Sequence, residues 1–189
     1  AKHVQRVGYD PTLPLYRAID FGFVNPFVCL WIQIGGDGMV RVIDEYLKNR
    51  ATIAEHAVVL KARTPCNESQ VAGTFCDPSG AGRNDVTGTS AIKELATLGI
   101  RTRCRHSKIL EGVEKIRAHL RAGDGSHRIV INPKCGHLIE ALQCYHYPEM
   151  PAYASELPKK DGVYDHAIDA LRYFFVNVSS QGLRTTSRY

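Results

Sequence analysis

Three short apolar segments near the start of the chain, separated only by tight turns, constrain its fold more than any other feature. They span residues 16–21, 27–34 and 39–46, and they are rich in residue types that favour strands. Gly22 to Pro26 form the first connection, and Gly35-Gly36-Asp37-Gly38 forms the second, which is typical of a hairpin turn. Because connections this short join antiparallel neighbours, the pattern predicts a three-stranded meander.

The pattern then changes to alternating helices and strands. Thr52 and Glu55 form a capping box that opens a helix over residues 51–62. Apolar spacing predicts the further helices 91–98, 109–120, 138–145 and 164–175, and the strands 71–77, 100–104 and 128–131. We therefore predict an α/β fold in which a mixed sheet carries helices on both faces. We expect an N-terminal arm or linker at residues 1–15, the domain at 16–178 and a C-terminal tail at 179–189.

Length and composition exclude several classes of protein. A chain of 189 residues with 44 % hydrophobic and 23 % charged residues suits one soluble globular domain. No apolar run approaches the roughly 20 residues that span a bilayer, and no phosphate-binding loop of the Gly-x-x-x-x-Gly-Lys-[Ser/Thr] type occurs. The chain begins with Ala1 rather than Met, so we expect it to be a piece of a longer protein.

The six cysteines include no Cys-x-x-Cys pair, and we expect them to be reduced. Cys135, His137, Cys144 and His146 have the residue types of a zinc site. All four lie on one predicted helix, where residues 135 and 146 cannot easily face 137 and 144. We therefore do not predict zinc.

Three aspartates occupy chemically unusual places. Asp20 ends the first apolar segment, Asp77 ends the strand 71–77, and Asp169 lies within the apolar pattern of the last helix. A carboxylate among buried apolar residues is costly unless it is paired, and several brought together repel unless a cation neutralises them. The pattern predicts a divalent-metal site of the kind used in phosphoryl chemistry.

The predicted fold can bring these aspartates together. If the first and fourth strands are parallel neighbours, Asp20 and Asp77 meet at one edge of the sheet. Asp165 and His166 flank Asp169 on one helix surface, and Arg172 shares that surface and could pair with either aspartate. Structural roles remain open as alternatives, because Asp20 and Asp77 suit turns and Asp165 suits a helix N-cap.

The formal net charge of +5 is concentrated in one region. Residues 99–121 carry seven basic and two acidic side chains, so this region alone accounts for +5: Arg101, Arg103, Arg105, Lys108, Lys115, Arg117 and Arg121 against Glu111 and Glu114. Charge alone leaves two interpretations open, a polyanion partner and a solvated helix face.

Four stretches resemble a known family, the C-terminal nuclease domain of the large terminase subunit of tailed double-stranded DNA bacteriophages. They are Leu-Pro-Leu-Tyr-Arg-Ala-Ile-Asp-Phe-Gly-Phe-Val-Asn-Pro (13–26), Val-Ile-Asp-Glu-Tyr (42–46), Cys-Asp-Pro-Ser (76–79) and Asp-His-Ala-Ile-Asp-Ala-Leu-Arg-Tyr (165–173). The resemblance covers nearly all of residues 4–177. It implies an RNase H-like fold with strand order 3-2-1-4-5.

The resemblance also implies a metal-dependent endonuclease that cuts concatemeric viral DNA during genome packaging. Asp20, Asp77 and Asp169 match the family's acidic positions, and His166 matches a histidine often found before the third. These carboxylates would hold two Mg²⁺ or Mn²⁺ ions roughly 3.5–4 Å apart, with Asp165 or His166 completing the second site. For contacts with the DNA backbone, with little sequence preference, we expect a set of basic side chains: Lys159 and Lys160 first, then Arg103, Arg105 and Lys108.

Further partners follow from the same resemblance. They are an ATPase domain in the full-length protein, a terminase small subunit and a portal protein; we expect no membrane association and a location in the host cytoplasm. Two alternatives remain. One is another RNase H-like nuclease, of the junction-resolvase or transposase type, and the other is a non-catalytic DNA-binding or docking module.

Overall fold

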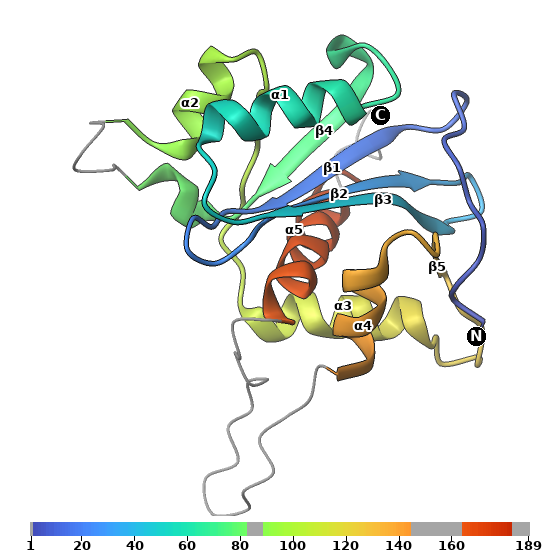
Figure 1. Cartoon of the computed structure of the whole chain (residues 1–189). Helices are drawn as coiled ribbons and strands as arrows, with labels where there is room; N and C mark the ends of the chain where they lie inside the picture. The colour runs from blue at the N-terminus through green and yellow to red at the C-terminus, as the bar shows by residue number, and fades with distance from the viewer. Residues whose placement is uncertain (1, 83–88, 145–163, 183–189) are drawn as a thin grey trace, which may run out of the picture.

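A computed structural model describes residues 2–82, 89–144 and 164–182 of the chain, and the side chains of the last helix as far as residue 178 (Figure 1). Its centre is one five-stranded sheet in the order β4-β1-β2-β3-β5. The strands are β1 (Leu15–Asp20), β2 (Phe27–Ile34), β3 (Val40–Lys48), β4 (Val71–Cys76) and β5 (Ile129–Ile131).

The predicted meander is confirmed, and so is the order of the first four strands. β1 pairs antiparallel with β2, β2 pairs antiparallel with β3, and β4 lies parallel to β1 on its other side. The predicted fifth strand, residues 100–104, lies beside β4 as the order 3-2-1-4-5 requires, but it makes only an isolated parallel bridge there, between Phe75 and Arg103. The segment predicted as a further strand at 128–131 forms β5, which pairs with β3 at the opposite edge of the sheet.

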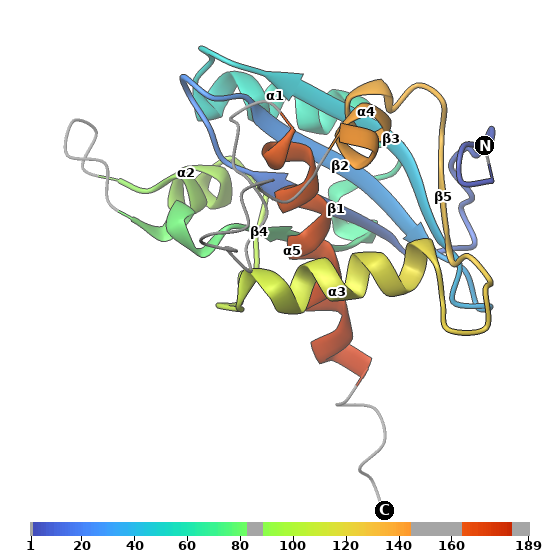
Figure 2. The ribbon, with the colours of Figure 1, turned by 90° about the horizontal axis from the view of Figure 1, so that it is seen from below.

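Helices cover both faces of the sheet, as the sequence predicts. One face carries α1 (Ile53–Arg63) and α2 (Ala91–Thr97). The other carries α3 (Ile109–Leu120), α4 (Gly136–Cys144) and α5 (Asp165–Gly182), and Figure 2 looks toward this layer. Two short 3-10 helices, η1 (Glu68–Gln70) and η2 (Pro78–Ala81), precede and follow β4.

The central strand β2 supplies both hydrophobic cores. Val28, Leu30 and Ile32 pack beneath α3, α4 and α5, while Cys29 and Trp31 face α1 and α2. Successive side chains of a strand point to opposite faces, so a strand between two helix layers must be apolar throughout. This explains the unbroken apolar run at residues 27–32.

The N-terminal residues lie along the sheet. Val4 forms a parallel bridge with Ile131, and the Gln33 side-chain amide donates to the carbonyl oxygens of Asp10 and Leu13 at 2.8 and 3.0 Å. At the other end, α5 continues to Gly182, beyond the predicted boundary at 178, and residues 183–189 of the predicted tail lie outside the described residues. None of the described helices combines the length and the apolar character that a membrane span requires.

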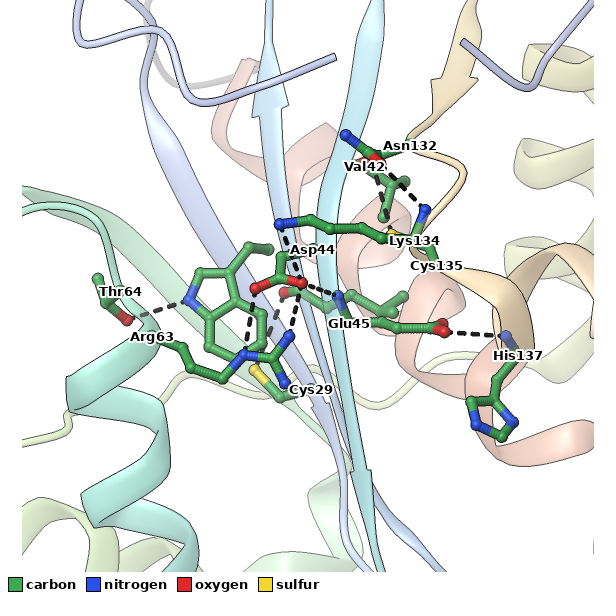
Figure 3. Close-up of polar contacts among 12 residues, drawn as sticks. Cys29, Val42, Asp44, Glu45, Arg63, Thr64, Asn132, Lys134, Cys135 and His137 are labelled. Atoms are coloured by element: carbon green, nitrogen blue, oxygen red, sulfur yellow. Dashed lines mark hydrogen bonds and ion pairs between the residues drawn. The ribbon is translucent and has the colours of Figure 1, made fainter. Parts of the chain in front are cut away.

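A polar network on β3 fixes the position of α4 (Figure 3). The buried Glu45 carboxylate accepts the first backbone N–H groups of α4, from His137 at 2.8 Å and Leu138 at 3.0 Å. The neighbouring Asp44 pairs with Arg63 of α1 and with Lys134. A carboxylate at a helix N-terminus satisfies donors that have no partner within the helix, so this network is structural.

The cysteines are free, as predicted, and Cys29, Cys76 and Cys135 are buried. Cys135 precedes α4 and Cys144 ends it, so the two cysteines lie at opposite ends of this helix. His146 falls outside the described residues.

Candidate active site

Asp20 and Asp77 lie at adjacent strand ends. β1 and β4 run parallel with Ile19 opposite Cys76, so Asp20, the last residue of β1, is level with Asp77, the residue that follows β4. Asp20 is buried. Parallel strands that end together place these carboxyl groups at one sheet edge, as the sequence predicts.

A close contact locks the two strand ends to each other. A side-chain methyl group placed on Gly80, within η2, would come within 2.2 Å of the Phe21 ring. Phe21 directly follows Asp20, and η2 directly follows Asp77, whose carboxylate accepts the backbone N–H of Ser79 at 2.9 Å. Only glycine fits here, because the aromatic ring occupies the space of any larger residue.

The first turns of α5 bring the remaining polar groups to this edge. Asp165, His166, Asp169 and Arg172 are all buried, as are the apolar residues between them, because α5 packs across the sheet in the middle of a helix layer (Figure 2). His166 Nδ1 lies 2.8 Å from Asp20 Oδ2, and His166 Nε2 lies 3.9 Å from Asp165 Oδ1. The helix therefore joins its own polar cluster to the end of β1.

Arg172 is held in the same cluster. Its Nε donates to Asp169 Oδ1 at 3.0 Å, which confirms that it pairs with one of the aspartates on its surface. A methyl group placed on Gly112 of α3 would lie 2.0 Å from Arg172 Cγ, so α3 approaches α5 closely at this point. The glycine leaves room for the arginine stem beneath α3.

The electrostatics show that the three aspartates share one neighbourhood. Burial raises the pKa of Asp20 to about 6; the His166 hydrogen bond opposes this shift, and the negative charges of Asp169 and Asp77 add to it. The hydrogen bond to Asp20 in turn raises the pKa of His166. Burial also raises the pKa of Tyr173, and the charges of all three aspartates raise it further. Repulsion among these carboxylates is what a cation would relieve.

The donor chemistry of the cluster fits a hard divalent cation, because carboxylate oxygens are its preferred ligands. Asp165 Oδ1 and His166 Nε2 are also buried without a hydrogen-bond partner. The arrangement of these side chains, in contrast, does not form a complete set of metal ligands. Within the described ranges, no group of three or more His, Cys, Asp or Glu side chains is arranged to hold a metal ion. Asp20, Asp77 and Asp169 each have a protein partner in this arrangement.

A cleft of about 330 Å³ opens beside Asp77. Arg105, His106, Arg172 and Tyr173 line it together with Asp77. Arg105 is exposed and also pairs with Glu111 at 3.6 Å. This cleft places positive charge next to the acidic edge, where a phosphate group would be attracted.

The predicted DNA-binding residues thus fall into separate groups. Arg105 lies in the cleft, and Lys108 is exposed just before α3. Arg103 lines a different groove, along the outer side of β4 with Arg101 and Glu68. Lys159 and Lys160 lie outside the described residues.

Sequence reasoning missed several residues of this site. His106 and Tyr173 line the cleft, and Gly80 and Gly112 permit the close contacts beside Asp77 and Arg172. Two of them carried a signal, since His106 lies within the basic region and Tyr173 ends the stretch 165–173 that resembles the family. The two glycines gave no such signal, because their importance depends on the Phe21 ring and on the aliphatic part of Arg172, which are distant in the sequence.

Solved structures of phage large terminases have a fold similar to that of this chain. The nuclease domain of the P22 large terminase superimposes with a TM-score of 0.70 at 16 % identity, over 96 % of this chain and 91 % of that one. The chain has the fold of a phage large-terminase nuclease domain. The resemblance drawn from the sequence is therefore confirmed at the level of the fold, including its RNase H-like α/β architecture.

Two further structures, both from thermophilic phages, agree. One is a large terminase that matches with a TM-score of 0.77 at 23 % identity, over 94 % of this chain but 43 % of that chain. This chain thus spans less than half of that longer terminase. The other is the large terminase nuclease of phage G20c with bound magnesium, which matches at 0.61 and 17 % identity, over 89 % of this chain and 84 % of that one. No protein-family profile and no curated protein matches the sequence.

Proposed function

We propose that this chain is a metal-dependent endonuclease, the nuclease part of a large terminase, that cuts concatemeric double-stranded viral DNA during genome packaging in the host cytoplasm. One observation carries the proposal. Within a terminase nuclease fold, Asp20 and Asp77 end adjacent parallel strands, and α5 brings Asp169 into their electrostatic neighbourhood.

Asp20, Asp77 and Asp169 would hold two Mg²⁺ or Mn²⁺ ions, with Asp165 and His166 as additional ligands. The magnesium and cobalt bound to the G20c nuclease support a divalent cation here. Such cations lower the pKa of water and neutralise the charge that develops during phosphoryl transfer.

The other side chains would orient this machinery. His166 hydrogen-bonds Asp20 and thereby fixes the direction of its carboxylate, and Arg172 does the same for Asp169. Arg172 also lines the cleft beside Asp77, where its charge would attract the phosphate being cut. Arg105 and His106 extend this positive surface.

Binding to DNA would depend mainly on phosphate contacts. Arg105, which lines the cleft beside Asp77, would contribute one of them, and Lys108, Arg103, Lys159 and Lys160 would contribute others further along the DNA. Phosphate contacts carry no sequence information, and their contribution falls as salt rises. We therefore propose little sequence preference and a steep loss of affinity with salt.

The remaining partners belong to the full-length protein. We propose that it carries an ATPase domain and that it works with a terminase small subunit and a portal protein. The partial coverage of the longer thermophilic-phage terminase, one structure of which is a complex with ADP, supports a longer polypeptide.

Cleavage of supercoiled plasmid tests the proposal. The purified chain should nick and linearise plasmid with Mn²⁺ and should leave it intact with EDTA. Asp20→Asn and Asp169→Asn should each abolish cutting while circular dichroism shows an intact fold. Asp124→Asn, a matched change at an exposed aspartate after α3, should retain full activity. Equal cutting by the Asp20→Asn and wild-type proteins would overturn the proposal.

A second candidate is a non-catalytic DNA-binding module, and one observation favours it. Each of the three aspartates already has a protein partner, and no ready-made metal-ligand group occurs in the described part of the chain. This candidate predicts DNA binding without Mn²⁺-dependent cutting. A junction resolvase, in contrast, would cut four-way junctions in preference to linear duplex.

A further inference from the structure

The turn between β1 and β2 exposes two large apolar side chains at the edge that carries the aspartates. Phe23 is 60 % exposed and Val24 is 77 % exposed, and Phe23 lies three positions after Asp20. Among the described residues, the other exposed large hydrophobic side chains are Val58 at 68 % and Val4 at 36 %. Adjacent exposed apolar residues beside a charged site indicate an interaction surface.

The turn is held in place by its own backbone. A methyl group on Gly22 would lie 2.4 Å from the carbonyl oxygen of Asn25 and 2.6 Å from that of Pro26, so the turn closes tightly on this glycine. Arg50, after β3, donates its N–H to the Phe23 carbonyl at 2.7 Å. Arg50 does so with φ at +54°, a costly conformation for a non-glycine residue. Phe23 is thus presented by a fixed turn.

Cations flank the apolar pair. Lys48 lies opposite Phe27 in the β2–β3 ladder, and both Lys48 and Arg50 are exposed. Behind the turn, a groove of about 390 Å³ separates it from the starts of α1 and α2; Phe21, Phe23 and Ile53 line this groove. An apolar tip between two cations suits a partner that offers both apolar surface and negative charge.

The position of the turn favours DNA as that partner. Along the edge, the order is Arg105, then Asp77 at the end of β4, then Asp20 at the end of β1, and then the turn that leads to β2. The aspartates therefore lie between two cationic surfaces. A duplex that is seated over the aspartates and contacts Arg105 on one side would reach the turn on the other.

We propose that residues 21–26 form a DNA wedge, in which Phe23 and Val24 contact the minor groove beside the cut site while Lys48 and Arg50 contact the flanking phosphates. Apolar side chains that enter the minor groove partly unstack a base step. The wedge rests on the proposed nuclease function, and it adds a contact that does not depend on the metal ligands.

A fluorescent reporter tests the wedge apart from catalysis. Trp31 is the chain's one tryptophan, and it is fully buried, so Phe23→Trp adds an exposed reporter at the turn. Val58→Trp, at a 68 % exposed position in the middle of α1, is the matched control. In EDTA and low salt, a short duplex should quench the residue 23 reporter and protect it from acrylamide, and it should leave the residue 58 reporter unchanged.

Affinity gives an independent measurement. Phe23→Ala should weaken duplex binding by about tenfold, the size of losing one aromatic contact with a base, and Val58→Ala should leave it unchanged. If the duplex binds but the residue 23 reporter does not respond, the wedge is overturned and the nuclease proposal stands. If the residue 23 reporter responds but the wild-type chain does not cut plasmid with Mn²⁺, the wedge stands and the nuclease proposal falls. If Phe23→Ala alters self-association and leaves DNA affinity unchanged, the surface is a protein contact and the wedge is wrong.

Discussion

At the scale of single residues, Asp20 would have to be charged to bind a metal ion, but its buried position disfavours that charge. Its carboxylate is buried beside other acids, which raises its pKa to about 6. At neutral pH the folded chain must therefore hold a charge that its surroundings disfavour, so function would be served at the expense of stability.

This tension predicts the stability of Asp20→Asn. A carboxyl group whose folded pKa is raised stabilises the fold fully below its unfolded pKa, and this contribution is lost as pH rises through about 6. In EDTA at about pH 8, Asp20→Asn should therefore be more stable than wild type by about 2 kcal/mol. The difference should shrink as pH falls toward about 4.

Urea denaturation at several pH values measures this gain. Asp124→Asn is the control, and it should show no gain, because Asp124 is exposed and its hydrogen bonds to Ser126 lower its pKa. If the Asp20→Asn protein is less stable than wild type at alkaline pH, the burial argument fails.

Residue-level prediction from the sequence worked where local spacing sets the contact. The pairing of Arg172 with Asp169 follows from their i,i+3 spacing on one helix. The contact of His166 with Asp20 is different, because it joins residues 146 positions apart and depends on how α5 crosses the sheet. Helix spacing alone could place His166 beside Asp169 but could not select its partner on β1.

At the scale of elements, close contacts at glycines set the geometry of the site. Gly80→Ala would push a methyl group into the Phe21 ring, so η2 and the end of β1 would have to separate. We expect a loss of about 1–3 kcal/mol in unfolding free energy and reduced cutting, because Asp77 moves relative to Asp20. Thermal unfolding and plasmid cleavage together measure both effects.

Gly136→Ala provides the comparison for this change. A methyl group there meets no atom within 4 Å, and Gly136 begins α4. This variant should keep wild-type activity with equal or higher stability. If Gly80→Ala behaves in the same way, the proposed lock between the strand ends is wrong.

The junction of β3 and α4 yields another prediction. Glu45→Ala removes the acceptor for two N–H groups at the start of α4 (Figure 3). We expect a loss of about 2 kcal/mol, because these buried donors then have no partner, and hydrogen exchange should speed up first in α4. Glu114→Ala, on the exposed side of α3, should cost much less. Equal effects of the two substitutions would contradict the helix-positioning role of Glu45.

The segments predicted as short strands show what element-level patterns leave undecided. Residues 100–104 resemble an edge strand and do lie beside β4, but only Arg103 bridges to it. Ile129–Ile131 is a fully buried segment that pairs with β3. A strand this short has too little periodicity to choose its neighbour, so the choice depends on long-range packing that no local pattern contains.

At the scale of the whole molecule, the layered fold brings distant segments to one edge. Asp20 ends β1, Asp77 follows β4 and Asp169 lies in α5, so consecutive members of the set are 57 and 92 positions apart in the sequence. The meander and the parallel crossover determine where they meet. The sequence predicted this architecture because apolar periodicity is strong in long elements. It could not predict the side-chain orientations at the edge, which depend on packing between layers.

The most direct measurement is the anomalous scattering of crystals grown or soaked with Mn²⁺. We predict one or two strong anomalous peaks among Asp20, Asp77 and Asp169, with these side chains turned toward the ions, and a loss of the peaks in Asp20→Asn crystals. If fully soaked wild-type crystals show no peak among these carboxylates, or show one only elsewhere, the metal-dependent nuclease account is contradicted.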